Sequence, residues 1–340
     1  MHTKLLYPSI EPTHAGMLKV GTFDQIYWEE CGNRLGEPIV FVHGGPGAGC
    51  SDVSRRFFNP QKYRAILFDQ RGCGRSKSTS DLSELTLKHM VDDLEVLRNH
   101  LKIERWILFG GSWGTTLALA YAKSHPTRVA GLLLRGVFTA SDSELAWLYQ
   151  EGGASQIFPQ EWSAFAEILN QGKQLTGKVK GIETTLTTSS DEIRIVESWV
   201  DYLSAYLSVL QSKDKEIQGK AAFSWANWEH SIMSVTGLPE LTPQDNERNC
   251  AMAIQSCHLF LNDPWLRGEN WWSTFADVEH IPCVIVQGQF DIVTPMKTAL
   301  ALHLGWKNSQ LRQVQGAGHA SSDRELMQAL IKSLDEWTTT

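Results

Sequence analysis

The sequence predicts an α/β fold in which helices flank a mostly parallel central sheet and a helical lobe is inserted into the chain. Apolar runs that end in glycine-bearing turns alternate with helical patterns between residues 17 and 138, and this alternation resumes near residue 281. The segment between them has helical periodicity and many tryptophans instead. Alternating strands and helices are typical of a parallel sheet covered by helices. We therefore expect the core at 1–138 and 266–340 and a helical cap at 139–265.

The expected core strands are short apolar runs, each followed by a turn. In chain order they are PIVFVHGG, YRAILFDQRG, RWILFGGS, VAGLLLRGVF, IPCVIVQGQFD and SQLRQVQGAGH. Helical patterns occupy residues 87–101 and the amphipathic end DRELMQALIKSLDEW. The polar stretch 171–192 is expected to be a surface loop or a ragged connection between helices.

Composition limits the class of protein. The chain has 340 residues, of which 42% are hydrophobic and 20% charged, and this is ordinary for a globular protein with a substantial core. A net charge of −7 argues against binding of nucleic acid. No stretch approaches the roughly 18 apolar residues that a membrane span needs.

The cysteines and the first residues bear on the compartment. The six cysteines are scattered, without a CxxC pair, which favours reduced thiols over a disulfide framework. The start, MHTKLLYPSIEPTHAG, lacks the basic flank and apolar stretch of a signal peptide. We therefore expect a cytoplasmic protein.

The stretch LFGGSWGTTLALAY (108–121) places a serine among glycines, after a strand pattern and before a helix pattern. A G-x-S-x-G turn at such a junction holds the serine in a strained conformation, exposes its hydroxyl and sets it at a helix N-terminus. The alternative is a glycine-rich packing turn with an incidental serine. The context favours Ser112 as a nucleophile, and with it the α/β-hydrolase fold.

A serine nucleophile needs a histidine base and an acid that orients it, and in this fold they follow the serine as acid and then histidine. Asp291 comes directly after the run VIVQGQF, and His319 lies in a loop after the next strand pattern. We expect Asp291 and His319 to complete a triad with Ser112. Their rivals are Asp142 as the acid and His280 or His303 as the base.

The nucleophile also needs donors for an oxyanion. The loop in VHGGPGAG follows a strand pattern, and the backbone N–H groups of Trp113 and of Gly44 or Gly45 are the expected donors. In FDQRGCGRS we expect Asp69 and Arg71 to tie a tight turn beside the site. No histidine pair has the spacing of metal ligands, so we expect no metal.

The motifs HGGPGAG, DQRGCGRS and GGSWGTTLALAYA resemble those of the proline iminopeptidases, a family of α/β hydrolases. The resemblance continues through LRGVF, WLYQEGGASQIFP, WANWE and GAGH, and so spans most of the chain. It implies release of N-terminal proline from peptides through an acyl-enzyme, in the cytoplasm, without metal or cofactor.

The resemblance also implies residues that bind substrate. Glu229, in SWANWEH, matches the family's amine-binding glutamate, and a buried carboxylate would bind the secondary ammonium of proline. Phe138 and Phe260 match aromatic residues that line the proline pocket, although both could be ordinary core residues. Where the family has a second glutamate, this chain reads IQSCHLF, with Ser256 at that position, or Gln255 if the alignment slips by one.

These departures leave alternatives open. Gln289 replaces the arginine that usually precedes the catalytic acid, and loss of one carboxylate weakens amine recognition by about 1–3 kcal/mol. The first hypothesis is a prolyl aminopeptidase acting on peptides. The second is a related esterase or amidase for small acyl or aminoacyl groups. A non-catalytic binding protein is a third, which the complete triad disfavours.

Overall fold

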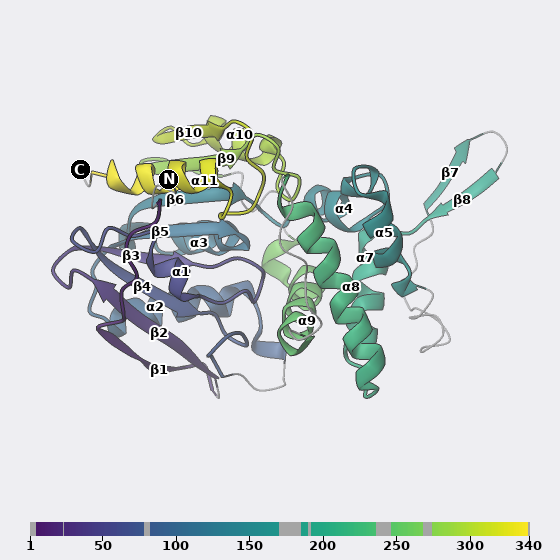
Figure 1. The fold of residues 1–340 in the computed structure, drawn as a ribbon, viewed down its shortest axis with the longest axis horizontal. Helices are drawn as coiled ribbons and strands as arrows, with labels where there is room; N and C mark the ends of the chain where they lie inside the picture. Colours follow the sequence, from purple (N-terminus) through teal and green to yellow (C-terminus); the bar gives the residue numbers. More distant parts are fainter. Residues whose placement is uncertain are drawn as a thin grey trace. The chain divides into compact units, whose positions relative to one another are not determined.

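The computed structural model describes residues 5–22, 24–77, 82–169, 185–189, 192–235, 246–267 and 274–338. The chain divides into two compact units. Unit 1 comprises Met1–Thr139 and Pro264–Thr340, and unit 2 comprises Ala140–Asp263. Both are drawn in Figure 1.

Unit 1 is built on an eight-stranded sheet with the order β1-β2-β4-β3-β5-β6-β9-β10 (Figure 1). Only the pairs β1–β2 and β2–β4 are antiparallel, while the remaining pairs are parallel, which confirms the predicted mostly parallel sheet. The strands are β1 His14–Val20, β2 Asp24–Gly32, β3 Glu37–Val42, β4 Tyr63–Asp69, β5 Trp106–Ser112, β6 Val129–Val137, β9 Cys283–Gly288 and β10 Ser309–Val314.

Helices pack against this sheet because its central strands are apolar on both faces, as in β5, where every residue before Ser112 is buried. One core cluster joins Ile107 and Phe109 of β5 to Leu326 and Leu330 on the apolar side of the last helix. The helices and 3-10 turns of unit 1 are α1 Asp52–Arg55, η1 Leu82–Glu84, α2 Leu87–His100, α3 Trp113–Ser124, η2 Pro126–Arg128, η5 Pro264–Leu266, α10 Met296–Gly305 and α11 Arg324–Asp335.

The strand pairing brings distant segments to one edge of the sheet. Ser112, the last residue of β5, is in register with Val137 at the end of β6. Gly288, the last residue of β9, pairs with Val314 at the end of β10. Because these strands are parallel, the loops that follow them lie at the same sheet edge, where open α/β sheets bind ligands.

Unit 2 is mainly helical, with an aromatic core. Phe165 is fully buried, and its ring lies 4.6 Å from that of Tyr206 and 5.7 Å from that of Trp228, centroid to centroid. Its elements are α4 Asp142–Tyr149, η3 Ala154–Gln156, α5 Pro159–Ala166, β7 Thr185–Ser189, β8 Glu192–Val196, α7 Trp199–Leu210, α8 Lys215–Met233 and α9 Asn246–Asn262.

One local prediction for unit 2 is wrong. Residues 185–189, expected to belong to a loop or helix connection, form β7 and pair antiparallel with β8. Their sequence TLTTS is rich in β-branched threonine, and this favours a strand over a loop. Residues 171–184, 190 and 191 of the same prediction lie outside the described residues.

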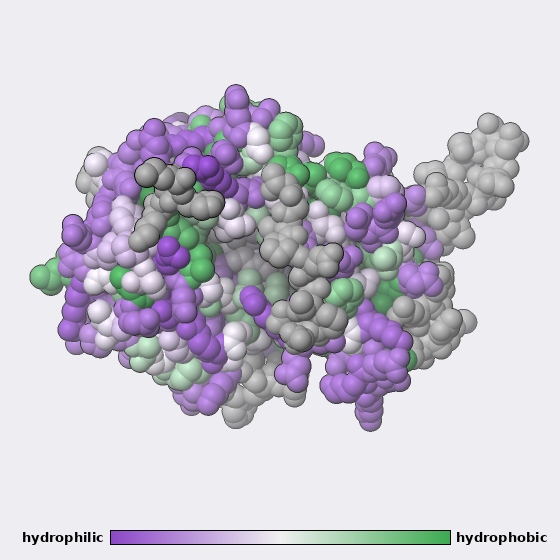
Figure 2. Space-filling model, viewed as in Figure 1, coloured by the Kyte–Doolittle hydropathy of each residue, from purple (hydrophilic) through white to green (hydrophobic). Residues whose placement is uncertain are grey.

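The surface is dominated by hydrophilic side chains on the face shown in Figure 2. In the parts of the chain that the structure describes, no helix has both the length and the apolar character needed to cross a membrane. All six cysteines are free thiols, and four of them, Cys31, Cys73, Cys257 and Cys283, are buried.

Candidate active site

Ser112 occupies a sharp turn between β5 and α3. Its backbone has φ 58° and ψ −125°, a conformation that a residue with a side chain rarely adopts. Two of the surrounding glycines are required by close contacts. A Cβ on Gly110 would lie 2.5 Å from the carbonyl oxygen of Gly114, and one on Gly114 would lie 2.0 Å from that of Val42. The glycines therefore let strand and helix approach closely enough to hold the serine in this turn.

Asp291 and His319 lie in direct contact, both buried. Nδ1 of the imidazole is 2.9 Å from Oδ2 and 3.1 Å from Oδ1 of the carboxylate. The two residues are 28 positions apart in sequence and are brought together by the loops that follow β9 and β10.

The Asp291 carboxylate is held by residues that the sequence analysis did not single out. Thr294 donates to it twice, from its backbone N–H at 2.7 Å and from its hydroxyl at 2.8 Å. Gln287 of β9 donates from its amide at 3.0 Å, and its Oε1 accepts from the backbone N–H of Val137 at 3.1 Å. Both supporting side chains are fully buried, which fixes the orientation of the carboxylate.

The other ring nitrogen of His319 contacts Arg135 of β6. Nη1 of Arg135 is 3.1 Å from Nε2 and donates to the His319 carbonyl oxygen at 2.8 Å. The structure shows no hydrogen bond between Ser112 Oγ and His319, although both residues lie next to the end of β6. Ser112 pairs with Val137, and a Cβ on the adjacent Gly136 would lie 2.8 Å from the imidazole Cε1.

The surroundings of His319 disfavour its charged form. Burial is the largest effect and lowers the pKa of the imidazole below its usual value of 6.5. The Asp291 carboxylate raises this pKa and the Arg135 guanidinium lowers it. The net direction is downward, so the ring stays neutral and able to accept a proton near pH 7.

The loop after β3 packs directly against the Ser112 turn. A Cβ on Gly44 would lie 2.9 Å from the carbonyl oxygen of Gly111 and 3.2 Å from Ser112 Cβ, so only glycine permits this approach. Gly45 has φ 113°, a conformation that glycine tolerates. Trp113 is the first residue of α3, directly after the serine. The structure thus packs Gly44 against the turn that contains Ser112 and Trp113, and Gly45 follows Gly44 in the same loop.

Gln70 joins this loop to the helix. Its side-chain amide donates to the His43 carbonyl oxygen at 2.8 Å, and its backbone N–H donates to His43 Nε2 at 3.0 Å. Its Oε1 accepts from the Trp113 indole N–H at 3.1 Å. All three residues are at most 2% exposed, so this bridge is a fixed part of the site.

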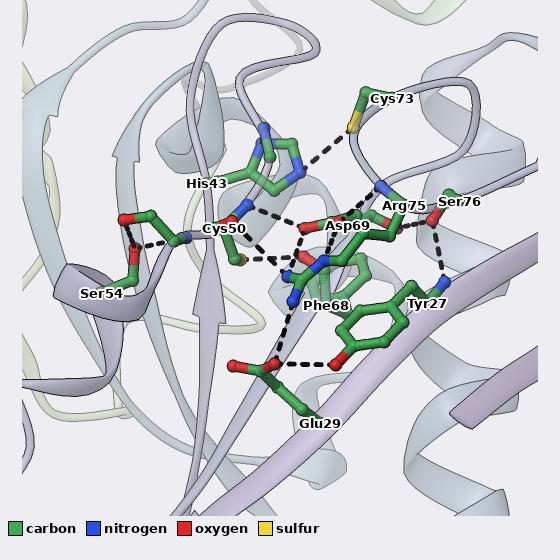
Figure 3. Close-up of polar contacts among 12 residues, drawn as sticks. Tyr27, Glu29, His43, Cys50, Ser54, Phe68, Asp69, Cys73, Arg75 and Ser76 are labelled. Atoms are coloured by element: carbon green, nitrogen blue, oxygen red, sulfur yellow. Dashed lines mark hydrogen bonds and ion pairs between the residues drawn. The ribbon is translucent and has the colours of Figure 1, made fainter. Parts of the chain in front are cut away.

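The turn around Asp69 is held by a different arginine from the one predicted (Figure 3). Arg75 Nε donates to Asp69 Oδ2 at 2.8 Å, and Cys50 donates its backbone N–H to Oδ1 at 2.8 Å. Burial alone would raise the pKa of Asp69, but these hydrogen bonds hold it below its usual value. Arg71 instead donates to Asp93 and to Asp24 at 2.6 and 3.0 Å. The predicted Asp69–Arg71 tie is therefore wrong.

The rival triad residues lie elsewhere. Asp142 is the first residue of α4 in unit 2. His303 contacts Ser309 Oγ through Nδ1 at 2.7 Å, and the His280 carbonyl oxygen accepts from the Asn308 side chain. None of these contacts involves Asp291 or His319.

Glu229 lies on α8 and lines a pocket of about 210 Å³ within unit 2. Its Oε1 accepts from the Tyr149 hydroxyl at 2.8 Å. Burial raises the pKa of Glu229 to about 7, although the hydrogen bond from Tyr149 acts in the opposite direction. The pocket is otherwise lined by Trp225, Ala226, His230, Met233, Arg248, Asn249 and Met252.

The remaining predicted substrate residues are buried. Phe260 of α9 lies 6.3 Å from the Tyr149 ring, centroid to centroid, so both Phe260 and Glu229 neighbour this tyrosine. Ser256 of α9 is 1% exposed, and its neighbour Gln255 is 4% exposed. In unit 1, the Phe138 backbone N–H donates to Thr115 Oγ1 at 2.8 Å, which fixes it beside the first turn of α3.

Comparison with known proteins shows which family this chain belongs to. Residues 37–325 match the family model described as the alpha/beta hydrolase fold. A curated proline iminopeptidase from Neisseria meningitidis serogroup B is 39% identical over 332 residues, which cover 97% of this chain and 98% of that protein. One from Arabidopsis thaliana is 38% identical, covering 97% of this chain and 81% of that protein.

The chain belongs to the proline iminopeptidase family of α/β hydrolases. Solved structures support the fold. An esterase from Exiguobacterium antarcticum matches with a TM-score of 0.61 at 18% identity, covering 95% of this chain and 98% of that one. A proline iminopeptidase-related protein from Thermus thermophilus matches with a TM-score of 0.53 at 18% identity, covering 94% of this chain and 98% of that one.

In this member of the proline iminopeptidase family, two of the residues that the sequence analysis missed share a signal. Arg135 is the one charged residue in VAGLLLRGVF, and Gln287 is the one polar side chain in CVIVQG. A lone polar residue in a buried strand needs a partner, because an unsatisfied buried polar group is costly. That signal indicates that a partner exists but does not identify it.

Proposed function

We propose that this protein is a serine aminopeptidase that releases N-terminal proline from peptides. Ser112 is the nucleophile, His319 the general base and Asp291 the residue that orients the imidazole. The observation that carries the proposal is the contact of His319 Nδ1 with both carboxylate oxygens of Asp291. It assigns the ring proton to Nδ1 and leaves Nε2 to accept the proton of a nucleophile.

In the first half of the reaction, Ser112 Oγ attacks the prolyl carbonyl carbon as its proton moves to His319 Nε2. The tetrahedral intermediate then collapses, the scissile C–N bond breaks, and the protonated imidazole gives its proton to the leaving amine. In the second half, His319 takes a proton from water, the hydroxide attacks the prolyl ester, and Ser112 leaves with that proton.

The negative charge of each tetrahedral intermediate needs donors that are already in place. We assign the backbone N–H groups of Trp113 and of Gly44 or Gly45 to this role. The close packing of Gly44 on the Ser112 turn supports this assignment. A donor of this kind contributes about 2.7–4 kcal/mol to stabilisation of the transition state.

We assign Glu229 to the substrate's secondary ammonium. Its carboxyl lines a pocket in which Trp225, Met233 and Met252 lie together with His230, Arg248 and Asn249. An ionised carboxylate there would form a charge-assisted hydrogen bond with an ammonium. The pocket volume of about 210 Å³ is below the ~300–1,000 Å³ typical of sites for drug-sized ligands, which suits a small group. Phe138, Phe260 and Ser256 are assigned to the substrate site on the family resemblance.

A second candidate is an esterase or amidase for small acyl or aminoacyl groups. The observation that favours it is Ser256, a neutral side chain at the position where the family resemblance implies a second amine-binding carboxylate. The chemistry at Ser112 would be the same, and only the selection of the acyl group would differ.

We further propose that peptides are the substrates met in the cell and that the protein works in the cytoplasm. The free state of all six cysteines suits a reducing compartment. The proposed reaction requires neither a metal nor an organic cofactor, because a neutral His319 can activate Ser112 directly.

The deciding experiment compares kcat/KM for a proline arylamide, an alanine arylamide, an N-acetylproline arylamide and a short-chain acyl ester. We expect the free-amine proline substrate to be preferred and acetylation to abolish its cleavage. Turnover of the ester or the acetylated substrate at a similar rate would support the second candidate. Retention of activity in Ser112→Ala, with the fold verified by circular dichroism, would overturn both.

A further inference from the structure

Arg135 has unusual surroundings for an arginine in a core strand. Its guanidinium donates to the His319 carbonyl oxygen and contacts the ring nitrogen Nε2. Among the residues that the structure describes, no carboxylate lies within 4 Å of it, in contrast to Arg55, Arg71 and Arg75, which all form ion pairs. Arg135 is half-buried. Because a positive charge without a close counter-ion is costly to withdraw from water, its position against the imidazole calls for an explanation.

The neighbouring glycines make this position possible. A Cβ on Gly111 would lie 2.6 Å from Arg135 Nη2 and 3.1 Å from Nε, so any side chain there would displace the guanidinium. Gly136 has φ 59°, and a Cβ on it would lie 2.8 Å from the imidazole Cε1 of His319. The glycine before the serine and the glycine after the arginine thus leave room for an arginine–histidine contact.

The contact has two electrostatic consequences. Because a guanidinium can only donate, Nε2 must be the unprotonated nitrogen, and the ring proton stays on Nδ1 facing Asp291. Because the guanidinium is always charged, it repels a second proton on the ring. Both effects favour the neutral tautomer that can accept a proton from Ser112.

We propose that Arg135 is a positioning residue that keeps His319 neutral, with Nε2 unprotonated, and so extends the activity of the catalytic base to lower pH. The charged groups that act on His319 are Asp291 in the loop after β9, Asp323 at the N-terminus of α11 and Arg135 on β6. The two carboxylates favour the protonated ring, and Arg135 is the charge that opposes them. The inference rests on the proposed function, which makes His319 the general base.

The contact between Arg135 and His319 Nε2 must also change when His319 accepts the proton of Ser112. Nε2 has a single lone pair, so the Ser112 hydroxyl and the Arg135 N–H cannot both donate to it. Formation of the serine–histidine hydrogen bond therefore requires the guanidinium to give up Nε2, while its bond to the His319 carbonyl oxygen can remain. No proton leaves Arg135 in this exchange.

The test measures the rate at which a small neutral fluorophosphonate labels Ser112 between pH 4.5 and 9, which requires the base but not the amine site. For the wild type we expect the midpoint of the acid limb below 6.5. Arg135→Met removes the charge and should raise this midpoint by about 0.5 to 1 pH unit. Arg135→Lys keeps a charge and should shift it less than half as far. Arg312→Met, at a position that contacts Ser333 and Glu336, should leave it unchanged.

A lower rate at every pH with an unchanged midpoint in Arg135→Met would overturn the proposal, because a merely structural role predicts that result. If Arg135→Met does not fold, ¹⁵N NMR titration of the wild-type histidines decides. A His319 ring that titrates at or above 6.5, or that carries its neutral-state proton on Nε2, contradicts the inference. Absence of labelling at Ser112 in the wild type would instead count against the proposed function, so the two failures are distinguishable.

Discussion

The Tyr149 hydroxyl donates a 2.8 Å hydrogen bond to Glu229, which fixes the position of the carboxylate. The same tyrosine ring stacks on Trp225, with 5.1 Å between centroids. The carboxylate is therefore fixed by a partner that is itself fixed by aromatic packing. Three of the predictions below depend on this pair.

The first prediction concerns pH and the nature of the substrate. Only ionised Glu229 attracts an ammonium, and its pKa is raised to about 7, so kcat/KM for a proline arylamide should fall as the pH drops below about 7. Labelling of Ser112 by a neutral fluorophosphonate does not use Glu229 and should fall only at the lower pKa of His319. Parallel pH profiles for the two reactions would contradict the assignment of Glu229.

The same pKa has a consequence for stability. Because the folded-state pKa of Glu229 is raised above its unfolded value of 4.5, its contribution is fully present below pH 4.5 and is lost as the pH rises through about 7. Glu229→Gln carries no group that ionises at this position, so the variant does not lose this stability as the pH rises. We expect the melting temperature of the variant to exceed that of the wild type more at pH 8 than at pH 4.5, as measured by differential scanning calorimetry.

The second prediction removes the hydroxyl that holds Glu229. Tyr149→Phe keeps the ring and its stacking but deletes a hydrogen bond that lowers the pKa of the carboxyl. The acid limb for the proline arylamide should move to higher pH, and kcat/KM at pH 7 should fall roughly 5- to 10-fold, about 1–1.4 kcal/mol. Tyr206→Phe is a matched control, because that hydroxyl bonds the Phe165 carbonyl oxygen and Ser224. An equal shift of the acid limb in both variants would rule out a specific role for Tyr149.

The third prediction concerns the bridge made by Gln70. Gln70→Leu removes the donor to the His43 carbonyl oxygen and the acceptor of the Trp113 indole, so the loop and helix that carry the proposed oxyanion donors lose their connection. We expect kcat to fall about 10- to 100-fold with KM within two-fold. We expect affinity for a proline boronic acid, which forms a tetrahedral adduct, to fall with kcat. A loss of stability alone, without the change in kcat, would assign Gln70 to folding only.

The fourth prediction contrasts two glycines. A Cβ on Gly114 would lie 2.0 Å from the Val42 carbonyl oxygen, so Gly114→Ala should lower the free energy of unfolding by about 2–3 kcal/mol or more and inactivate the site. Gly219, inside α8, would place its Cβ no closer than 3.4 Å to Asn246. Gly219→Ala should therefore stabilise the protein by about 0.5–1 kcal/mol, because alanine is the better helix former. Urea unfolding of both variants checks the contrast.

The parts of the fold that the sequence predicted are those encoded by neighbouring residues. The apolar runs of β3 to β6, β9 and β10 are continuous in the chain, and the glycines around Ser112 lie within two residues of it. Steric contacts between neighbouring residues determine the turn at Ser112, so its glycine pattern predicted the turn without a structure. Asp291 and His319 were found because each follows such a run.

The supporting residues could not be found in this way, because their partners are distant in sequence. Gln70 and Trp113 are 43 positions apart, and Arg135 and His319 are 184 apart. The wrong prediction for Arg71 has the same origin. Arg71 and Asp69 are close in sequence, but Asp93, 22 positions away, lies within hydrogen-bond reach of the guanidinium and Asp69 pairs with Arg75 instead.

The pairing of β6 with β9 has a consequence for how such a chain can diversify. Leu132 to Arg135 lie in register with Cys283 to Val286, although the whole of unit 2 separates the two strands in sequence. The ladder between them is made by residues of unit 1 alone. Insertions, deletions or wholesale exchange of residues 140–263 can therefore accumulate without shifting the register of β6 and β9 that supports the Asp291–His319 contact. The proposed triad and the inserted segment can therefore vary independently, and a chimera joined at residues 139 and 264 is the natural way to exchange the segment.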